Sequence, residues 1–514
     1  MIRWDIPDSW KWTNAGEIAE VVGGGTPPSK DDNNFTSQGT PWITPADLTG
    51  YQDAYIARGK RSLSEVGLAK SSAKVLPKGT VLYTSRAPIG YCAIAENPIA
   101  TNQGFKNLVL GDDLIPEFVR HYLLASKEYA ESISSGTTFK ELSASRMKGF
   151  EIPIAPTKEQ RRIVAKIEAL QERSRKAREA LSEVGPLLEQ FRQSLLAAAF
   201  RGDLTADWRA ENPDVEPASQ LLARIRQERR ERWEQAELAK YEAKGKKPPK
   251  GWKEKYQEPE PVDDSELPEL PEGWCWGAME ELCTNIVDCP HSTPKWTDSG
   301  KLCVRTTEFR PGRLDLTNAR FVSEKTFEER VARLTPEPGD ILYSREGGIL
   351  GIACQIPDDT QLCLGQRMMV MRPTLEITAS FVMNWLNSPY VFLDRVKSKI
   401  QGAASPHINV GEVKRFPVPV PSSLEQARIA IAIQEGMELI DNVEQHQSFS
   451  EKELVRLDQS ILAKAFRGEL VPQDPNDEPA SVLLDRIREQ REAAGKKAKK
   501  PVRRKRKQPE GQSS

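Results

Sequence analysis

The sequence predicts an α+β protein in which two similar α/β domains lie at opposite ends of a long antiparallel coiled coil. Three observations support this fold class. The second half of the chain repeats the first at a fixed offset, a heptad pattern follows each half, and short β-rich runs precede each heptad pattern. Together they indicate an internal repeat with pseudo-twofold symmetry within one chain of 514 residues.

The repeat is clearest at the end of each heptad segment. The run from Ala199 to Gly202 returns 266 positions later as the run from Ala465 to Gly468, with the same four residues, Ala-Phe-Arg-Gly. The same offset relates Gln160 to Gln426, among several other pairs. A period of this length excludes a solenoid and indicates a duplicated unit, made of one domain and one long helix.

Each domain is expected to begin at a pair of tryptophans and to continue as a curved, irregular sheet. Residues 79–86 form a turn that leads into a buried strand, and residues 339–345 repeat this pattern. Residues 89–94 and 350–353 supply the next strand, and short helices are expected over 117–125 and 379–386. Because Gly, Pro, Asn and Asp separate the runs, we predict short strands joined by turns.

The helix after each domain has the spacing of a coiled-coil seam. From Ile163 to Leu195, apolar or small residues recur at alternating steps of four and three. The second copy matches these positions, although polar residues weaken its middle. About 41 residues of helix span roughly 60 Å. The residues that we assign to the seam are Ile163, Ile167, Leu170, Leu181, Ile429, Ile433, Ile440 and Leu454.

Local signals mark the start and the middle of these helices. Thr157 with Gln160, and Ser423 with Gln426, have the spacing of a capping box. Pro186 lies inside the first helix, and proline removes one hydrogen bond of the helical ladder, so we expect a kink there but not in the second copy.

The chain therefore divides into seven predicted segments. These are a first domain (1–155), a first spacer helix (156–202), a connecting segment and linker (203–269, with the linker from about 233), a second domain (270–421), a second spacer helix (422–468), a C-terminal repeat segment (469–492) and a basic disordered tail (493–514). Antiparallel helices would relate the two domains by a local dyad, which is also the local symmetry of duplex DNA. The other interpretation, that the heptads only brace or dimerise the domains, remains open.

Composition sets limits on chemistry and location. The chain has 73 basic and 74 acidic residues, so any nucleic-acid surface must be a local one. Its 7 cysteines form no Cys-x-x-Cys pair, and Cys283, Cys289 and His291 lack a second pair at ligand spacing, so we predict no metal site. No apolar run is long enough to span a membrane. We expect a reduced, cytoplasmic protein, and with only 4 histidines we find no catalytic residues.

Several motifs occur in the same order in both halves of the chain. This duplicated order resembles the specificity subunit of type I restriction–modification systems over nearly the whole chain. The motifs are Trp10 and Trp274, Thr26-Pro27 and Thr293-Pro294, Leu82-Tyr83 with Arg86, Leu342-Tyr343 with Arg345, Ile152-Pro153 and Val418-Pro419, and the two Ala-Phe-Arg-Gly helix ends.

The resemblance implies that each domain is a target-recognition domain that reads one half of a split, asymmetric site on double-stranded DNA, with the helices as spacer. It also implies two methylation subunits, which bind S-adenosylmethionine and methylate adenine N6. Restriction subunits, which use ATP and Mg, would complete the complex. The chain itself would bind no cofactor and catalyse no reaction. Two other hypotheses remain open, a self-sufficient enzyme acting on DNA and a protein-assembly scaffold with duplicated interaction domains.

The residues that we expect to touch DNA lie at strand ends and in loops. Arg86 and Arg345 follow a buried strand, and arginine binds guanine bidentately or holds a phosphate, although a structural salt bridge is equally compatible with the pattern. The remaining candidates are Thr26, Ser85, Lys106, His291, Lys295, Arg305, Ser344 and Arg367.

Overall fold

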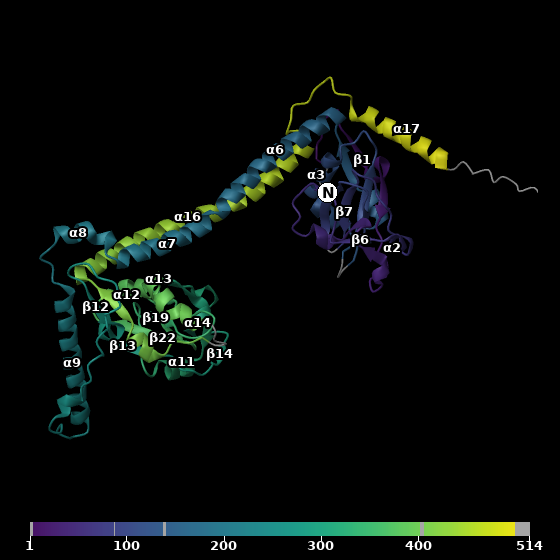
Figure 1. Ribbon diagram of the computed structural model, residues 1–514. Coiled ribbons are helices and arrows are strands. Elements are labelled where there is room, and N and C mark those ends of the chain that lie inside the picture. The colour runs from purple at the N-terminus through teal and green to yellow at the C-terminus, as the bar shows by residue number, and fades with distance from the viewer. Residues whose placement is uncertain (1–3, 87, 137–139, 401–405, 499–514) are drawn as a thin grey trace, which may run out of the picture. The chain divides into compact units, whose positions relative to one another are not determined.

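The computed structural model describes residues 4–86, 88–136, 140–400 and 406–498 (Figure 1). They divide into two compact units. Unit 1 contains the residues up to 182 together with those from 448 onward, and unit 2 contains residues 183–447. Residues 499–514 of the tail that we expected to be disordered lie outside the described residues, whereas its first part, up to Ala498, continues helix α17.

The domain of unit 1 contains two larger sheets and one two-stranded sheet. A five-stranded sheet has the order β2-β10-β7-β8-β5, a four-stranded sheet has the order β3-β6-β4-β9, and β1 pairs with β11 to join the two ends of the domain. The strands are β1 (Lys11–Asn14), β2 (Ala19–Gly23), β3 (Phe35–Thr36), β4 (Thr40–Ile43), β5 (Tyr55–Ile56), β6 (Arg61–Leu63), β7 (Val81–Ser85), β8 (Ile89–Ala95), β9 (Ala100–Thr101), β10 (Lys106–Leu110) and β11 (Glu151–Ile154).

The domain of unit 2 repeats this frame with sheets of order β13-β22-β19-β20 and β14-β18-β15-β21, and with β12 paired to β23. Its strands are β12 (Cys275–Ala278), β13 (Cys283–Asp288), β14 (Trp296–Thr297), β15 (Lys301–Val304), β16 (Phe309–Arg310), β17 (Arg313–Leu314), β18 (Arg320–Val322), β19 (Ile341–Ser344), β20 (Ala353–Gln355), β21 (Leu362–Leu364), β22 (Met368–Pro373) and β23 (Pro417–Val420).

Short helices cover the sheets. Helices α3 (Pro116–Ala125) and α12 (Ala379–Leu386) confirm the two expected positions. The other short helices are α1 (Ala15–Ile18), α2 (Glu65–Ala69), α4 (Lys127–Ser132), α5 (Ala144–Lys148), α8 (Ala206–Glu211), α10 (Met279–Leu282), α11 (Glu324–Val331), α13 (Pro389–Val391), α14 (Lys397–Ile400) and α15 (Val410–Lys414).

Strands β7 and β19 lie at the centre of the two cores and are buried on both faces. Because successive side chains point to opposite faces of a sheet, Tyr83 packs into the cluster that contains α3, whereas Leu82 packs into the cluster towards the second sheet. Tyr343 and Leu342 divide in the same way. The predicted strand over 350–353 was wrong, because Gly351 adopts a positive φ of 82° in a turn and β20 starts only at Ala353.

The long helices are α6 (Thr157–Ser182), α7 (Val184–Phe200) and α16 (Ser423–Phe466). The first heptad segment is broken at Glu183, next to the predicted kink, because Pro186 has no N–H to donate to the carbonyl four residues earlier. Helix α16 is continuous. Five of the predicted seam residues are buried and Leu170, Leu181 and Leu454 are half-buried; the buried ones are Ile163, Ile167, Ile429, Ile433 and Ile440.

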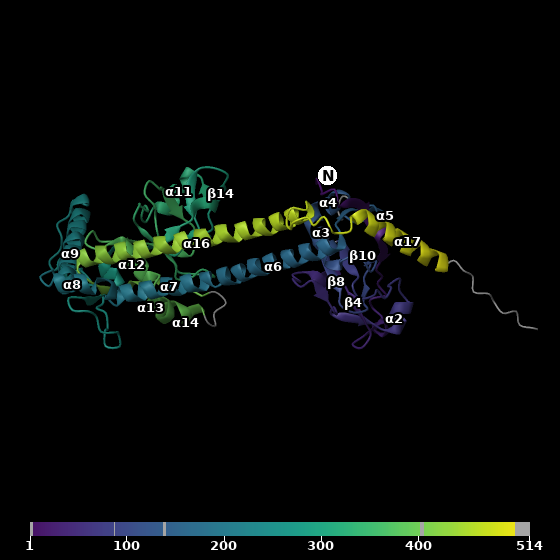
Figure 2. The ribbon, with the colours of Figure 1, turned by 90° about the horizontal axis from the view of Figure 1, so that it is seen from above.

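Within each unit the paired helices run antiparallel (Figure 2). In unit 1, Arg178 of α6 forms an ion pair of 2.5 Å with Asp458 of α16. In unit 2, Arg192 of α7 lies 3.4 Å from Glu444, and Gly436 of α16 faces Leu195 so closely that a Cβ there would collide with it. The absence of a side chain at Gly436 therefore allows the close approach of α7 and α16.

Each long helix is attached to its domain by a buried glutamine. Gln160 donates through Nε2 to the carbonyl of Ala155 (2.8 Å) and accepts through Oε1 from the N–H of Ile115 (3.2 Å), just before α3. Gln426 makes the corresponding bonds to Pro421 (3.1 Å) and Thr378 (3.0 Å). The capping boxes that we predicted were wrong, because the hydroxyls of Thr157 and Ser423 donate to the domain, to the carbonyls of Asp113 (3.2 Å) and Glu376 (3.2 Å).

A second contact at each junction comes from the segment that follows the end of the partner helix, α7 in unit 2 and α16 in unit 1. In unit 2, the N–H of Ala218 donates to the carbonyl of Gly273 (2.9 Å), and in unit 1 the N–H of Ala480 donates to the carbonyl of Ser9 (2.9 Å). These residues begin α9 (Ala218–Ala243) and α17 (Ala480–Ala498). Helix α9 also extends through the first eleven residues of the predicted linker. Its charged residues form ion pairs with residues one turn away along the helix, and these pairs stabilise it.

Helix α3 carries a buried histidine that makes the stability of unit 1 sensitive to acid. His121 is 2% exposed, and burial, with a smaller contribution from Arg120, lowers its pKa to about 3. The unfolded chain has the ordinary value of 6.5, so it binds more protons than the folded chain between pH 6.5 and 3, and folding stability falls as the pH falls through that window.

We expect the free energy of unfolding of unit 1 to decrease by roughly 2 kcal/mol from this group alone between neutral pH and pH 5. The measurement is chemical denaturation of the wild type and of His121→Leu at a series of pH values. The difference between the two proteins should change with pH below 6.5 and stay constant above it. A constant difference across the series rules out the buried neutral histidine.

Candidate DNA interface

In each domain, the same loops meet at one end of the main sheet. In unit 1, the N–H of Ser85 at the end of β7 donates to the carbonyl of Gly104 (2.7 Å), and the N–H of Leu142 donates to the carbonyl of Ser85 (2.9 Å). The loop after β2 reaches the same place, because the Thr26 hydroxyl donates to Gln103. This loop end brings together four segments that are distant in the sequence.

Unit 2 has the matching construction. The N–H of Arg345 donates to the carbonyl of Arg367 (3.0 Å), the N–H of Ile408 donates to the carbonyl of Arg345 (2.9 Å), and the Thr293 hydroxyl donates to Gln366 (3.3 Å). We call this set of loops the loop end of each domain.

The matching bonds correct one sequence-based correspondence. We paired Arg86 with Arg345, but the backbone bonds show that Arg345 occupies the position of Ser85. Arg86 corresponds instead to Glu346, since Arg86 bridges to Glu141 and Glu346 bridges to His407. The two domains therefore carry opposite charges at the same place, a cation in unit 1 and an anion in unit 2.

The loop end of unit 1 has two cations around one carboxylate. Glu141 lies 3.8 Å from the guanidinium of Arg86 and 3.5 Å from the ammonium of Lys106, whose Nζ also donates to the Ser85 hydroxyl at 3.3 Å. Arg86 remains about a third exposed, whereas the Lys106 side chain is largely covered. Arg86 is therefore the cation of this group that can reach a ligand without rearrangement.

In unit 2, Arg345 is a structural residue. Its side chain is 7% exposed and forms two bonds of 2.7 Å to the carboxylate of Asp288 and one ion pair of 2.7 Å to Glu346. Burial opposes the charged form, but the hydrogen bonds and charge of Asp288 together with the charge of Glu346 outweigh it and raise the pKa of Arg345 above its ordinary value. The guanidinium fixes the end of β13 to the residue that follows β19, so the structure does not favour the DNA contact that we expected.

Ser85 and Ser344 are also interior residues. The Ser85 hydroxyl donates to the carbonyl of Gly104 (3.0 Å), and the Ser344 hydroxyl accepts from the N–H of Ile352 (2.8 Å). Both side chains are completely buried. They hold the turns in place, and the sequence motif around the two tyrosines marked this structural role rather than a contact surface.

The other predicted contacts lie at the surface of the loop ends. Thr26, His291, Lys295 and Arg367 are exposed, and His291 lies 3.0 Å from Asp288 through Nε2. Arg367 has a positive φ of 71°, which is uncommon outside glycine and holds its side chain at the turn into β22. Among the described residues, neither Lys295 nor Arg367 has an ion pair.

Arg305 interacts with the second sheet. Its guanidinium forms an ion pair of 2.5 Å with Glu308 and lies 5.9 Å from the ring centroid of Trp296, on the second sheet. Arg320 lies over the same ring at 5.4 Å. This pair of stacked arginines was not predicted as a group, because its members are far apart in the sequence.

Sequence reasoning also missed Gln103 and Gln366. Both precede a central strand and accept a hydrogen bond from the threonine of the Thr-Pro motif. Their offset is 263, because three residues fewer separate the two copies at this point. A search at the main offset of 266 therefore misses a pair that the structure brings into register.

The described residues contain no group of three His, Cys, Asp or Glu side chains that could hold a metal ion. Cys283 and Cys289 pack into different hydrophobic clusters, and burial raises the pKa of the Cys283 thiol to about 12. Within that part of the chain, no helix has both the length and the hydropathy needed to cross a bilayer.

The two arginines of the unit 2 loop end should differ in their effect on stability. Arg345→Met leaves the Asp288 carboxylate mostly buried without its main counter-charge, and we expect a loss of about 3 kcal/mol in the free energy of unfolding of unit 2. Arg367→Met removes an exposed cation and should change it by less than about 0.5 kcal/mol. Urea denaturation measures both, and equal losses contradict the assignment.

Comparisons with known proteins agree with this construction. Residues 7–182 and 298–447 match the family described as type I restriction modification DNA specificity domain. The type I restriction enzyme MjaIX specificity subunit of Methanocaldococcus jannaschii is 42% identical over 193 residues, which are 36% of this chain and 44% of that protein. The type I restriction enzyme EcoBI specificity subunit of Escherichia coli is 24% identical over 501 residues, 96% of this chain and 94% of that protein.

Two solved structures share the fold. One, described as concerning complex assembly and conformational transition of the type I R-M system, aligns with a TM-score of 0.62 and 21% identity over 91% of this chain and 100% of the other. The HsdS subunit from Thermoanaerobacter tengcongensis aligns with a TM-score of 0.54 and 20% identity over 91% and 99%. With the family match covering more than half of its length, the chain belongs to the type I restriction–modification DNA specificity family.

Proposed function

We propose that this chain is the sequence-specific DNA-binding subunit of a type I restriction–modification complex and that it recognises a bipartite, asymmetric site. One observation carries the proposal beyond the family: the two domains share a frame but present different side chains at their loop ends. Arg86 and Glu141 stand where the other domain has Glu346 and His407. Because base pairs are distinguished by the pattern of donors and acceptors in the major groove, unlike side chains on like frames suit two different half-sites.

Within each loop end we assign contact to the exposed side chains and positioning to the buried ones. Arg367, Lys295 and His291 lie on adjoining loops of unit 2, since Gln366 donates to the carbonyl of His291. Arginine suits a guanine edge or a phosphate, and lysine suits a phosphate. Arg86 with Thr26 has this role in unit 1, and Arg305 on Trp296 suits the DNA backbone.

The long helices are proposed as an antiparallel coiled coil that relates the two domains by a pseudo-twofold axis. The antiparallel contacts within each unit, the paired glutamine junctions and the reciprocal docking of Ala218 and Ala480 support this arrangement. Such a dyad presents the domains to a duplex as two inverted half-sites, and the length of the helices sets the gap between them.

Catalysis is proposed to reside in partner subunits in the cytoplasm. Two methylation subunits would bind S-adenosylmethionine and methylate adenine N6, which requires the base to leave the duplex stack. Restriction subunits would use ATP and Mg to cleave DNA. Large apolar side chains stay exposed on α7 and α16, as expected for a surface that docks other proteins; they include Leu187, Phe191, Leu439, Phe449 and Leu457.

Arg367→Ala should weaken binding of the complex to its specific DNA by about 10-fold or more, and it should lower the salt dependence of binding if the contact is to a phosphate. A contact to guanine would instead relax the preference at one base pair, by about 1–3 kcal/mol. Fluorescence anisotropy at several salt concentrations measures both. Arg415→Ala, an exposed arginine between α15 and β23, is the matched control and should have no effect.

Exchanging residues 1–155 for those of another family member should alter one half of the methylated motif and leave the other half and the gap unchanged. Mapping methylated adenines in genomic DNA from cells that carry the exchanged protein measures this directly. A motif that stays the same, or changes in both halves, overturns the bipartite assignment. Methylation without any sequence motif, in a complex that still assembles, would favour the scaffold.

A further inference from the structure

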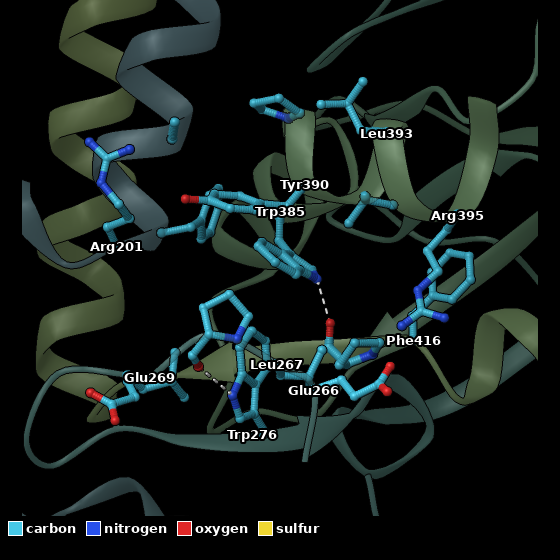
Figure 3. Close-up of a pocket in the computed structure, with 17 residues that line it drawn as sticks. Arg201, Glu266, Leu267, Glu269, Trp276, Trp385, Tyr390, Leu393, Arg395 and Phe416 are labelled. Carbon is cyan, nitrogen blue, oxygen red and sulfur yellow. Dashed lines mark hydrogen bonds between the residues drawn. The ribbon is translucent and has the colours of Figure 1, made fainter. Parts of the chain in front are cut away.

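Unit 2 contains an apolar pocket of about 560 Å³, away from the loop end, where α7 ends and where the segment before β12 passes α12 and α13 (Figure 3). The rings of Phe200, Trp276, Trp385 and Tyr390 surround it. Figure 3 shows Trp276 and Trp385 held by hydrogen bonds to the carbonyls of Pro268 (3.3 Å) and Pro417 (2.8 Å). The aromatic walls are therefore fixed, and we call this space the aromatic pocket.

The same frame of rings is present in unit 1. Phe466 and Tyr122 have ring centroids 5.1 Å apart at 73°, and Phe200 and Trp385 have centroids 5.0 Å apart at 67°. Trp12 lies 6.5 Å from Tyr122, and the corresponding pair of unit 2, Trp276 with Trp385, lies 6.1 Å apart. The internal repeat thus built this corner of the domain twice.

The two copies differ in what fills the corner. In unit 1, the indole of Trp4 stacks on Phe466 at 6.5 Å and 16° and meets Tyr122 edge-on at 6.3 Å. Trp4 precedes Trp10 by six residues, and in unit 2 the residue six positions before Trp274 is Pro268. A pyrrolidine ring is much smaller than an indole. Phe200 and Trp385, which correspond to the two rings that Trp4 contacts, therefore line an open pocket.

We propose that the aromatic pocket receives an aromatic side chain from a protein partner, the methylation subunit. The choice of this partner rests on the proposed function. The occupied copy shows which group the frame accepts, the indole of Trp4. A buried aromatic residue in a fixed pocket is the usual anchor of a protein interface. The rim carries both signs of charge, Arg201 and Arg395 with Glu266 and Glu269, which suits the polar neighbours of such an anchor.

Pro268→Trp tests the proposal because it restores in unit 2 the residue found in unit 1. The indole should fill the pocket from within, keep or raise the melting temperature, and weaken the complex with the purified methylation subunit by at least about 10-fold, as measured by biolayer interferometry. Leu375→Trp, which adds an indole at a fully exposed site of the same unit, is the control and should bind as the wild type does.

Three results overturn the proposal. Unchanged affinity in a Pro268→Trp protein whose melting temperature rises shows that the pocket is only a vacancy. Equal losses in Pro268→Trp and Leu375→Trp show a nonspecific effect. Self-association of the wild type, abolished by Pro268→Trp in sedimentation velocity, assigns the pocket to a second copy of the chain. The exchange of residues 1–155 leaves the pocket untouched, so failure of the proposed function is seen separately.

Discussion

The rest of the structure depends on the buried Glu-Gln pair at the start of each long helix. Gln160 and Gln426 bind the N–H group at the start of α3 and α12. The preceding glutamates bind the segment that follows the end of the partner helix. Glu159 accepts a hydrogen bond from Gln473, and Glu425 accepts one from Thr205. A buried polar group is costly unless it is paired, so these bonds leave the helix one orientation on its domain. Together with the apolar residues of the helix that are buried in the same core, they give the exposed loops at the other end of the domain a defined direction.

The loop ends show how a frame can be retained while its contact surface changes. Hydrogen bonds between backbone groups fix the loops in both domains, and a backbone bond does not depend on the side chain. Position 85 and its counterpart 345 can therefore hold a serine in one domain and an arginine in the other, provided that Asp288 neutralises the arginine. The side chains at the surface can therefore differ while the interior stays the same, because the backbone atoms of these residues hold the loops and the side-chain atoms form the contact surface.

The sequence was sufficient for features that repeat locally and insufficient for those that depend on distant partners. The heptad steps predicted the helices, and Pro186 predicted the break near Glu183, because both act through neighbours along the chain. The strand motif located β7 and β19, but its arginines were paired one residue out of register, since only the bonds to segments 104 and 367 define the alignment. Glu141, the carboxylate between Arg86 and Lys106, lies 55 residues beyond Arg86 and gave no local signal.

The docking of Ala480 onto Ser9 has a consequence for biosynthesis. Phe466 and Leu483 belong to the same hydrophobic cluster as Trp10 and Phe118, so the domain that contains Trp10 lacks part of its interior until residues 466–483 have been made. Contacts between such remote segments are slow to form because the loop between them must first be closed. Nascent chains of this protein would therefore carry an unfinished apolar surface while the intervening residues are made, which makes them natural clients for a chaperone.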